Sequence, residues 1–314
     1  MKQNYTFSVY SIDKTMDTRS KKRKNLLLLI AYLSTFLFGS QEIFAQFPGN
    51  DNTPGIGKTF NVPVGVTSVT ASSWGGGGGG GGSNSNTNGG NGGGGGGATT
   101  RTIAVTGGVT TFTYTVGSGG AAGAAAGGTG GNGTLSSITS ASPLTNMIAN
   151  GGTGGVGNRG SLNLPTNSGG GTASGGTTNS NGLNGTRVGA PGGDGGDSGT
   201  VIGIFGIGGA GSTNAVGNPG GTPGAGGGGG ENGGGTRAGG AGANGRVTFQ
   251  YIGVTSITPN PVCVGSTITI TGFNFAAGAN TVSKNCTAST YVIRENARTS
   301  TEVVATEKAS GTVL

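Results

Sequence analysis

Alternating hydrophobic and polar positions predict β-strands on both sides of a long glycine-rich stretch. At residues 59–74, a strand, a Pro-Val-Gly turn at 63–65 and a second strand follow one another. Val69 and Ala71 share one face of the second strand, and Trp74 is out of phase with both. Either a bulge intervenes, or the tryptophan closes the opposite side of the sheet.

Two further stretches carry the same period of two. Residues 101–116 contain two alternating runs separated by Thr-Gly-Gly at 106–108, an order that predicts a β-hairpin. Residues 246–251 place Val247 and Phe249 on one face and predict a final strand. Because these strands hold much of the aromatic content of the glycine-rich part, they are the expected source of a hydrophobic core.

Between residues 117 and 245 the sequence has no helical periodicity but repeats doubled glycines at intervals of three, as in 151–156 and 192–197. Three residues per turn is the period of polyproline II, a helix without internal hydrogen bonds. With glycine on two of three sides, such helices can approach until neighbouring backbones bond, while Asn, Ser and Thr take the outward side. The predicted fold class is all-β, with strands anchoring a polyproline II bundle and negligible helix outside the leader.

Disorder is the alternative for the same stretch. Glycine and proline account for 77 and 10 of the 314 residues, a content typical of low-complexity chains. Ordering one residue costs about 1–2 kcal/mol of backbone entropy, and more for glycine, whereas a hydrogen bond returns about 1 kcal/mol net. A bundle therefore also needs close backbone packing and apolar islands such as 201–205. The sequence leaves both alternatives open.

Residues 1–45 have the pattern of a secretory signal peptide. A basic cluster at 21–24 precedes a mostly apolar run at 26–38, and cleavage is expected near Ala45. The apolar run is shorter than the ~20 residues that span a membrane, which argues against a retained anchor. Met16 is a second candidate start. We therefore expect a secreted or cell-surface protein with no stable membrane insertion after cleavage.

Composition removes most catalytic chemistries. The chain has no histidine, which excludes serine–histidine and cysteine–histidine pairs and histidine metal ligands. The net charge is +7, but seven of the 17 basic and three of the ten acidic residues lie in the leader. The rest is only weakly basic and has no basic cluster, so we expect no nucleic-acid binding. We also expect no enzymatic activity, cofactor or metal.

Three motifs resemble ligand sites but depart from them. Residues 55–59 lack the first glycine of a phosphate-binding loop, and 206–211 have dinucleotide-binding spacing without a helix to follow. Residues 192–197 begin like a calcium-binding nonapeptide, but only once. A paired-carboxylate hydrolase would need Asp194 and Asp197 to converge, and solvated carboxylates are the better interpretation.

The run from Phe60 to Val69, closing with Trp74-Gly75-Gly76, resembles the opening of glycine-rich domains of bacterial surface and secreted proteins. Residues 114–120 and 245–249 match the same pattern, so the resemblance covers about 200 residues, which we delimit as 46–252. Similar modules occur in phage tail adhesins and in some receptor tyrosine kinase ectodomains. The resemblance implies β elements that carry a polyproline II bundle, with ligand-binding loops at its tip.

Residues 253–314 are similar to an immunoglobulin-like IPT/TIG domain. They have a proline-containing start, a strand with Ile268 and Ile270, and a later strand at 301–306. The resemblance implies a small β-sandwich that acts as a spacer or binding module. The domain is expected to be incomplete, because the sequence stops where a final strand would begin.

The two cysteines, Cys263 and Cys286, both lie in the same region. They either form one disulfide, worth about 3 kcal/mol in the chain-entropy model, or are two separately buried small side chains. The sequence leaves both alternatives open.

The best functional hypothesis is an exported, non-enzymatic bacterial protein that adheres to or recognises a cell-surface glycan or another extracellular polymer. Its contacts would come from loops between the glycine helices, rich in Asn, Ser and Thr. A structural matrix or spacer protein without a specific ligand is the alternative, and ice binding by regularly spaced threonines is a less favoured one. A polysaccharide-degrading enzyme remains only if carboxylates converge.

Overall fold

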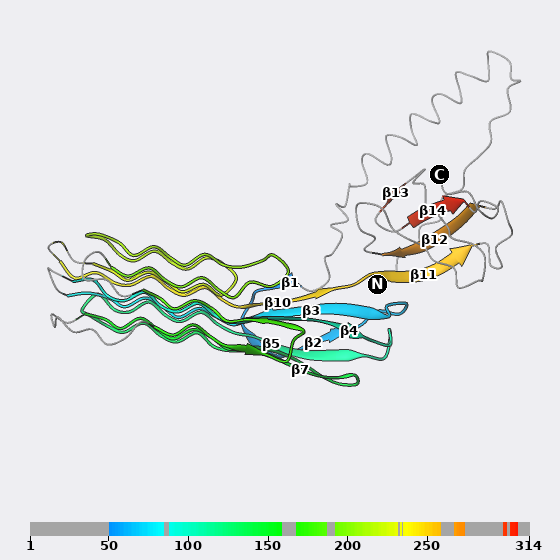
Figure 1. Ribbon diagram of the computed structural model, residues 1–314, viewed down its shortest axis with the longest axis horizontal. Helices are drawn as coiled ribbons and strands as arrows, with labels where there is room; N and C mark the ends of the chain where they lie inside the picture. The colour runs from blue at the N-terminus through cyan, green and yellow to red at the C-terminus, as the bar shows by residue number, and fades with distance from the viewer. Residues whose placement is uncertain are drawn as a thin grey trace, which may run out of the picture. The chain divides into compact units, whose positions relative to one another are not determined.

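The computed structural model describes residues 50–84, 88–158, 168–186, 192–231, 233, 235–258, 267–273, 298–299 and 302–306. Throughout these ranges the regular structure is β-strand, and no helix occurs (Figure 1). The predicted all-β fold class is therefore confirmed. Among the described residues no helix is long and apolar enough to cross a membrane. The leader 1–45, with Met16, and both cysteines lie outside the described residues.

Two five-stranded antiparallel sheets form a sandwich in the glycine-rich part, with strand orders β1-β10-β3-β4-β9 and β2-β5-β6-β7-β8. The strands of the first sheet are β1 (Asn50–Asp51), β10 (Arg246–Gln250), β3 (Ser68–Trp74), β4 (Ala98–Ala104) and β9 (Thr178–Ser180). Those of the second are β2 (Gly55–Asn61), β5 (Thr111–Val116), β6 (Ser136–Ala141), β7 (Leu144–Ala149) and β8 (Ala173–Ser174).

The C-terminal region contributes a separate four-stranded antiparallel sheet of order β11-β12-β14-β13. Its strands are β11 (Gly253–Thr258), β12 (Thr267–Phe273), β13 (Arg298–Thr299) and β14 (Glu302–Thr306). The strands predicted around Ile268 and at 301–306 are thus present. An antiparallel sheet is compatible with many domain types, so the IPT/TIG identity stays a prediction.

The hydrophobic core lies between the two sheets of the sandwich. Phe249 of β10 is the centre of an aromatic cluster, with ring centroids 4.3 Å from Phe60 and 5.4 Å from Phe112. Val69 and Ala71 are fully buried on the same face, as their alternation predicts. Each such large apolar side chain contributes roughly 1.5–3 kcal/mol on burial. The sandwich is therefore the part of the domain that is stabilised by burial of large apolar side chains, as in an ordinary globular protein.

The hairpin predicted at 101–116 is wrong, because β4 and β5 belong to different sheets. The Thr110 amide donates to the Thr106 carbonyl, and the Gly108 amide donates to the Val62 carbonyl, so the turn packs against the 62–66 segment. The chain crosses here from one sheet to the other, which lets Phe112 face the apolar side of the first sheet. A period of two reports which residues share a face, but not which strand is the partner.

Trp74 closes the opposite side of its sheet. All seven residues of β3 pair with β4 in unbroken register, so no bulge precedes the tryptophan. Its ring packs with Ala98, Val201 and Ile204, and its indole Nε1 donates to the Ile204 carbonyl at 3.3 Å. The apolar island at 201–205 therefore covers the outer face of the sheet where β3 runs into glycine.

Glycine-rich extended segments continue directly from the strands and pack side by side as a bundle (Figure 1). In segment 75–83, every third amide donates to the same neighbour: Gly75 and Gly78 donate to the carbonyls of segment 90–97. The intervening amides donate in turn to segments 128–134 and 237–245. This period of three, with bonds only between segments, is the geometry of polyproline II.

The carbonyls of segment 75–83 follow the same rule and accept from segments 117–124, 150–158 and 224–231. Six neighbours therefore surround this segment, and consecutive neighbours also bond to each other. Segments 90–97 and 224–231 are enclosed in the same way. The structure is thus a close-packed bundle with three inner segments, and it supports the ordered alternative over disorder.

Complete enclosure explains why the inner segments contain unbroken glycine runs. Each residue of 75–82 is buried, and a Cβ on any of them would overlap a neighbouring backbone carbonyl; for Gly78 it is that of Thr153. The expected arrangement, with glycine on two sides of three, holds only for the outer segments. The inner ones need glycine on all three sides, and the runs 75–82, 92–97 and 226–230 are its direct signal.

A glycine-to-alanine pair tests this packing. We expect Gly78→Ala to destabilise the domain by about 3 kcal/mol, the upper end of typical overpacking costs, because the added methyl meets rigid backbone and not a movable side chain. Gly235→Ala is the matched control, since its Cβ would meet nothing within 4 Å. Urea denaturation followed by tryptophan fluorescence measures both variants. Equal stability of the two would contradict the close-packed bundle.

Candidate recognition surfaces of the glycine bundle

In the outer segments, side-chain oxygens accept hydrogen bonds from backbone amides that, in an inner segment, would donate to a neighbouring backbone carbonyl. Asn132 Oδ1 accepts from the Gly154 amide at 2.8 Å, and Asn184 Oδ1 accepts from the Gly170 amide at 2.9 Å. These amides lie at the rim, the outer surface of the hydrogen-bonded bundle (the lattice). Among the described residues no further backbone segment lies on that side, so the acceptor is a side chain of the adjacent segment. Thr, Ser and Asp residues do the same elsewhere on the rim. Many polar residues at the rim are therefore structural.

Asp194 and Asp197 belong to this structural class. Their Oδ1 atoms accept from the Gly211 and Gly208 amides, each at 2.7 Å. Three residues separate them along an extended segment, roughly 9 Å at the polyproline II rise, which suits successive turns of the neighbour. In the described part of the chain no group of three or more His, Cys, Asp or Glu residues could hold a metal ion.

The bundle ends away from the sheets in a polar, hydrogen-bonded tip. The Ser83 backbone exchanges two hydrogen bonds with Arg237, at 2.8 and 2.9 Å. The side chains of Ser83 and Asn158 both donate to the Asn88 carbonyl, at 2.7 and 2.9 Å. Exposed Asn84 follows directly. This tip matches the place where loops rich in Asn, Ser and Thr are expected.

A second part of the tip is built around a buried carboxylate. Glu231, only 7 % exposed, accepts from the Asn214 amide through Oε2 at 3.3 Å. Ser212 Oγ donates to the Ala215 carbonyl at 2.6 Å. The turn 212–215 is thereby held in shape, with Asn214 at φ 56°. Residues 85–87, 159–167 and 187–191 lie outside the described residues.

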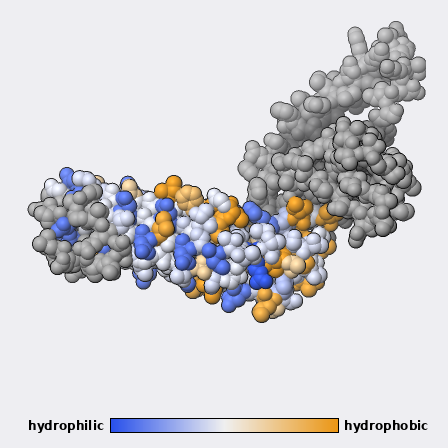
Figure 2. Space-filling view, in the orientation of Figure 1, coloured by the Kyte–Doolittle hydropathy of each residue, from blue (hydrophilic) through white to orange (hydrophobic). Residues whose placement is uncertain are grey.

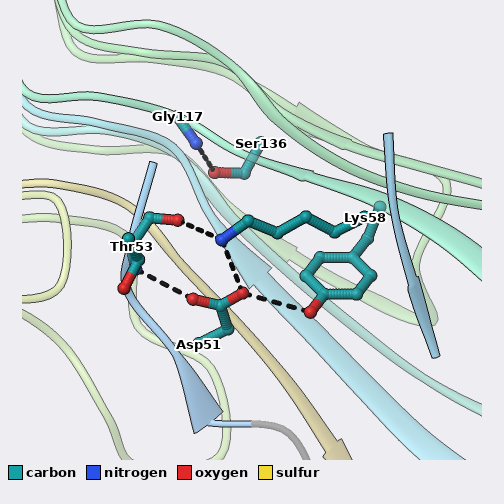
Figure 3. Close-up of polar contacts among 6 residues, drawn as sticks. Asp51, Thr53, Lys58, Gly117 and Ser136 are labelled. Atoms are coloured by element: carbon teal, nitrogen blue, oxygen red, sulfur yellow. Dashed lines mark hydrogen bonds and ion pairs between the residues drawn. The ribbon is translucent and has the colours of Figure 1, made fainter. Parts of the chain in front are cut away.

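A polar cluster at the edge of the sandwich joins the two sheets (Figure 3). Lys58 Nζ lies 2.8 Å from Asp51 Oδ2, and Tyr114 Oη donates to the same oxygen at 3.1 Å. The Thr53 amide donates to Asp51 Oδ1 at 2.9 Å. Burial by itself would raise the pKa of Asp51, but the hydrogen bonds from Lys58, Thr53 and Tyr114 outweigh it and lower the pKa. Burial, reinforced by the hydrogen bond to Asp51, raises the pKa of Tyr114.

This cluster was not foreseen from the sequence. Residues 55–59, rejected as a phosphate-binding loop, are part of strand β2, and Lys58 is the partner of Asp51. The two residues are seven apart along the chain but on strands of different sheets, so no local pattern connects them. Its role is structural, because it fixes the short strand β1 against β2 and β5.

Comparison with known families identifies the domain. The glycine-rich domain family matches residues 53–252, which is more than half of the chain. The chain therefore belongs to the glycine-rich domain family. Comparison with curated proteins gave no match.

Removing the Asp51 carboxylate tests the cluster through pH. The lowered pKa means that ionised Asp51 stabilises the fold above its unfolded pKa of about 3.9, and that this contribution disappears as pH falls through the folded value. We expect Asp51→Asn to cost about 1 kcal/mol at pH 7, because the pair is partly exposed. Thermal denaturation from pH 7 to 2 should then show a smaller acid destabilisation than in the parent. An unchanged acid slope would contradict this assignment.

A second pair of variants tests the side-chain caps of the rim. We expect Asn132→Ala to cost about 1 kcal/mol, because the Gly154 amide loses its acceptor. Thr129→Ala, one helical turn away on the same segment at an exposed position, should be neutral. Hydrogen exchange of the Gly154 amide should accelerate in the first variant alone. Faster exchange in both would show that the effect is not the lost cap.

Proposed function

We propose that this protein is an exported recognition module that adheres through the tip of its glycine bundle to a neutral glycan or a similar extracellular polymer. The observation that carries the proposal is the layout of the bundle. Its segments run from the sandwich, where several of them continue from strands, and reverse at a common far end (Figure 1). A scaffold of this kind presents several short loops together on rigid supports, which is the arrangement typical of binding surfaces.

The chemistry of the tip favours a neutral, hydroxyl-rich ligand. Its exposed groups include the side chains of Asn84, Thr213 and Asn214, which offer both donors and acceptors. The charged residues described near it are few: Glu231 is buried and accepts from a backbone amide, and Arg237 is half-buried. A charged polymer would find little to pair with on these residues.

Catalysis is not part of the proposal. The chain has no histidine, and Asp194 and Asp197 both accept backbone hydrogen bonds in the lattice instead of converging on a cleft. Export through the leader, cleavage near Ala45, a bacterial surface or extracellular location, and a C-terminal IPT/TIG-like spacer complete the proposed picture. None of these features requires a cofactor or a nucleic acid.

The alternative is a matrix or spacer protein without a specific ligand. It is supported by the number of polar rim residues that are explained by the lattice itself, as Asn132 and Asn184 are. Such residues need no external partner to account for them. Ice binding has less support, because the rim threonines do not form one continuous row: Thr153 and Thr172 lie on different segments and hydrogen-bond within the bundle.

A glycan array probed with the labelled chain starting at Gln46 tests the proposal. We expect binding to a restricted set of neutral glycans, reduced at least about tenfold by Asn84→Ala with Thr213→Ala, because each lost hydrogen-bonding group weakens a polar site. Asn218→Ala, exposed on the flank of the bundle, should bind like the parent. Absence of any glycan or cell-surface binding would favour the spacer alternative.

A further inference from the structure

The outer segments form a closed ring around the inner three, and their order follows from the hydrogen bonds. Each segment bonds to the next along the ring, and the last bonds back to the first. The order is 117–124, 128–134, 150–158, 168–172, 181–186, 192–200, 206–212, 215–221 and 237–245. The outward residue of each segment therefore has a definite place on the perimeter of the bundle.

The perimeter divides into a polar half and an apolar half. Segments 128–134 to 192–200 turn mainly Asn, Thr and Asp outward, with Leu183 as the large apolar exception. The remaining segments, which are contiguous on the ring, turn mainly aliphatic residues outward, with Asn218 as the exposed polar exception. The exposed apolar residues of this half and of the turn leading into it include Phe205, Ile207, Ala210, Val216, Pro219, Ala241, Ala121, Ala122 and Ala124. The expectation that Asn, Ser and Thr face outward therefore holds for only part of the perimeter.

Exposure on the apolar half is substantial. Ile207 is 68 % exposed, Val216 is 52 % and Phe205 is 45 %. Figure 2 shows apolar residues along the upper edge of the bundle, where Figure 1 places the yellow-green segments. Contiguous exposed apolar surface of this kind usually marks an interaction site.

We propose that the apolar half of the bundle is a self-association surface whose occupant is a second copy of this chain. The half has no acidic residue, and its one basic residue, Arg237, lies at the tip end of segment 237–245. Two identical faces therefore meet without like-charge repulsion. A strongly charged partner, by contrast, would leave its charges unpaired and desolvated.

The shape of the surface is self-complementary. Outward residues recur every third position on each segment, so ridges of methyl groups alternate with glycine grooves at a spacing that both copies share. A two-fold contact brings one patch against itself and closes the assembly as a dimer, which avoids open-ended growth. Ala and Gly also lose little side-chain entropy on burial.

The size of the surface predicts weak association. The four segments, of about eight residues each, are roughly 24 Å long at the polyproline II rise and about 20 Å wide along the ring, which turns a corner at 215–221. Two copies would then bury at most about 1,000 Å² in total, below the ~1,200–2,000 Å² of stable complexes. We therefore expect a dimer that forms only at high local concentration, as on a cell surface, where pairing would increase avidity.

Analytical ultracentrifugation of the chain starting at Gln46 tests the inference. The weight-average mass should rise from one chain at about 1 µM toward two chains at about 1 mM, as expected for a small, weak interface. Ile207→Asp should keep the chain monomeric over this range. Leu183→Asp is the matched control, a 59 % exposed aliphatic residue on the polar half, and should dimerise like the parent.

Other results identify other occupants and overturn the proposal. A parent chain that stays monomeric up to 1 mM rejects a second copy, and equal loss of dimer in both variants places the interface elsewhere. Co-sedimentation with phosphatidylcholine vesicles, abolished by Ile207→Asp and without dimer formation, would assign the face to lipid. Thermal melting verifies that each variant is folded. The readout is mass and not glycan binding, so its outcome is independent of the proposed recognition function.

Discussion

Backbone hydrogen bonds between glycine segments are the interaction on which the domain depends. Each inner amide donates to a carbonyl of another segment, as the Gly78 amide does to the Gly94 carbonyl at 2.8 Å. Such bonds form only if the segments approach to backbone contact, and a Cβ on any glycine of the runs 75–82, 92–97 and 226–230 would prevent that approach. Glycine thus allows neighbouring backbones to come into contact here, although elsewhere its main effect is conformational freedom and an added entropic cost. The bundle needs many of these bonds because each contributes only about 1 kcal/mol net.

The β-sandwich supplies what the lattice lacks. Its aromatic and aliphatic core, centred on Phe249, gives a folding energy that glycine cannot provide. Strands β3, β4 and β10 are paired in fixed register, and the segments that continue from them inherit this register, so Trp74 opposite Ala98 sets the pairing of Gly75 with Gly97. Val201 and Ile204 pack over Trp74 at the boundary between the sandwich, which has a side-chain core, and the bundle, which packs through its backbone. The sandwich therefore aligns the bundle as well as stabilising it.

The perimeter is where function is free to vary. Positions in the inner glycine runs are restricted to glycine by steric overlap. Outer residues such as Asn132 and Asp197 accept hydrogen bonds from amides of neighbouring segments. What remains is the tip, with its polar turns, and the outward side chains of the outer segments. The division of that perimeter into a polar and an apolar half gives the bundle two faces of different polarity. A recognition tip and a weak self-association face on one rigid scaffold would act together on a crowded surface.

The sequence by itself determined the local structure wherever residue types recur at a regular spacing along the chain. The alternation at Val69 and Ala71 predicted their shared buried face, and the three-residue period of glycine predicted extended helices packed through their backbones. Partner choice was decided only in the tertiary structure. The period of two at 101–116 fits a hairpin as well as the observed crossing between sheets, and β6 and β7 were not foreseen in a region dominated by glycine. The same holds for Asp51, Lys58 and Tyr114, and for the ring order that gathers Ile207, Ala241 and Ala122 on one half. A periodic pattern encodes which way a side chain points, whereas the neighbour it meets depends on contacts between segments that are distant along the chain.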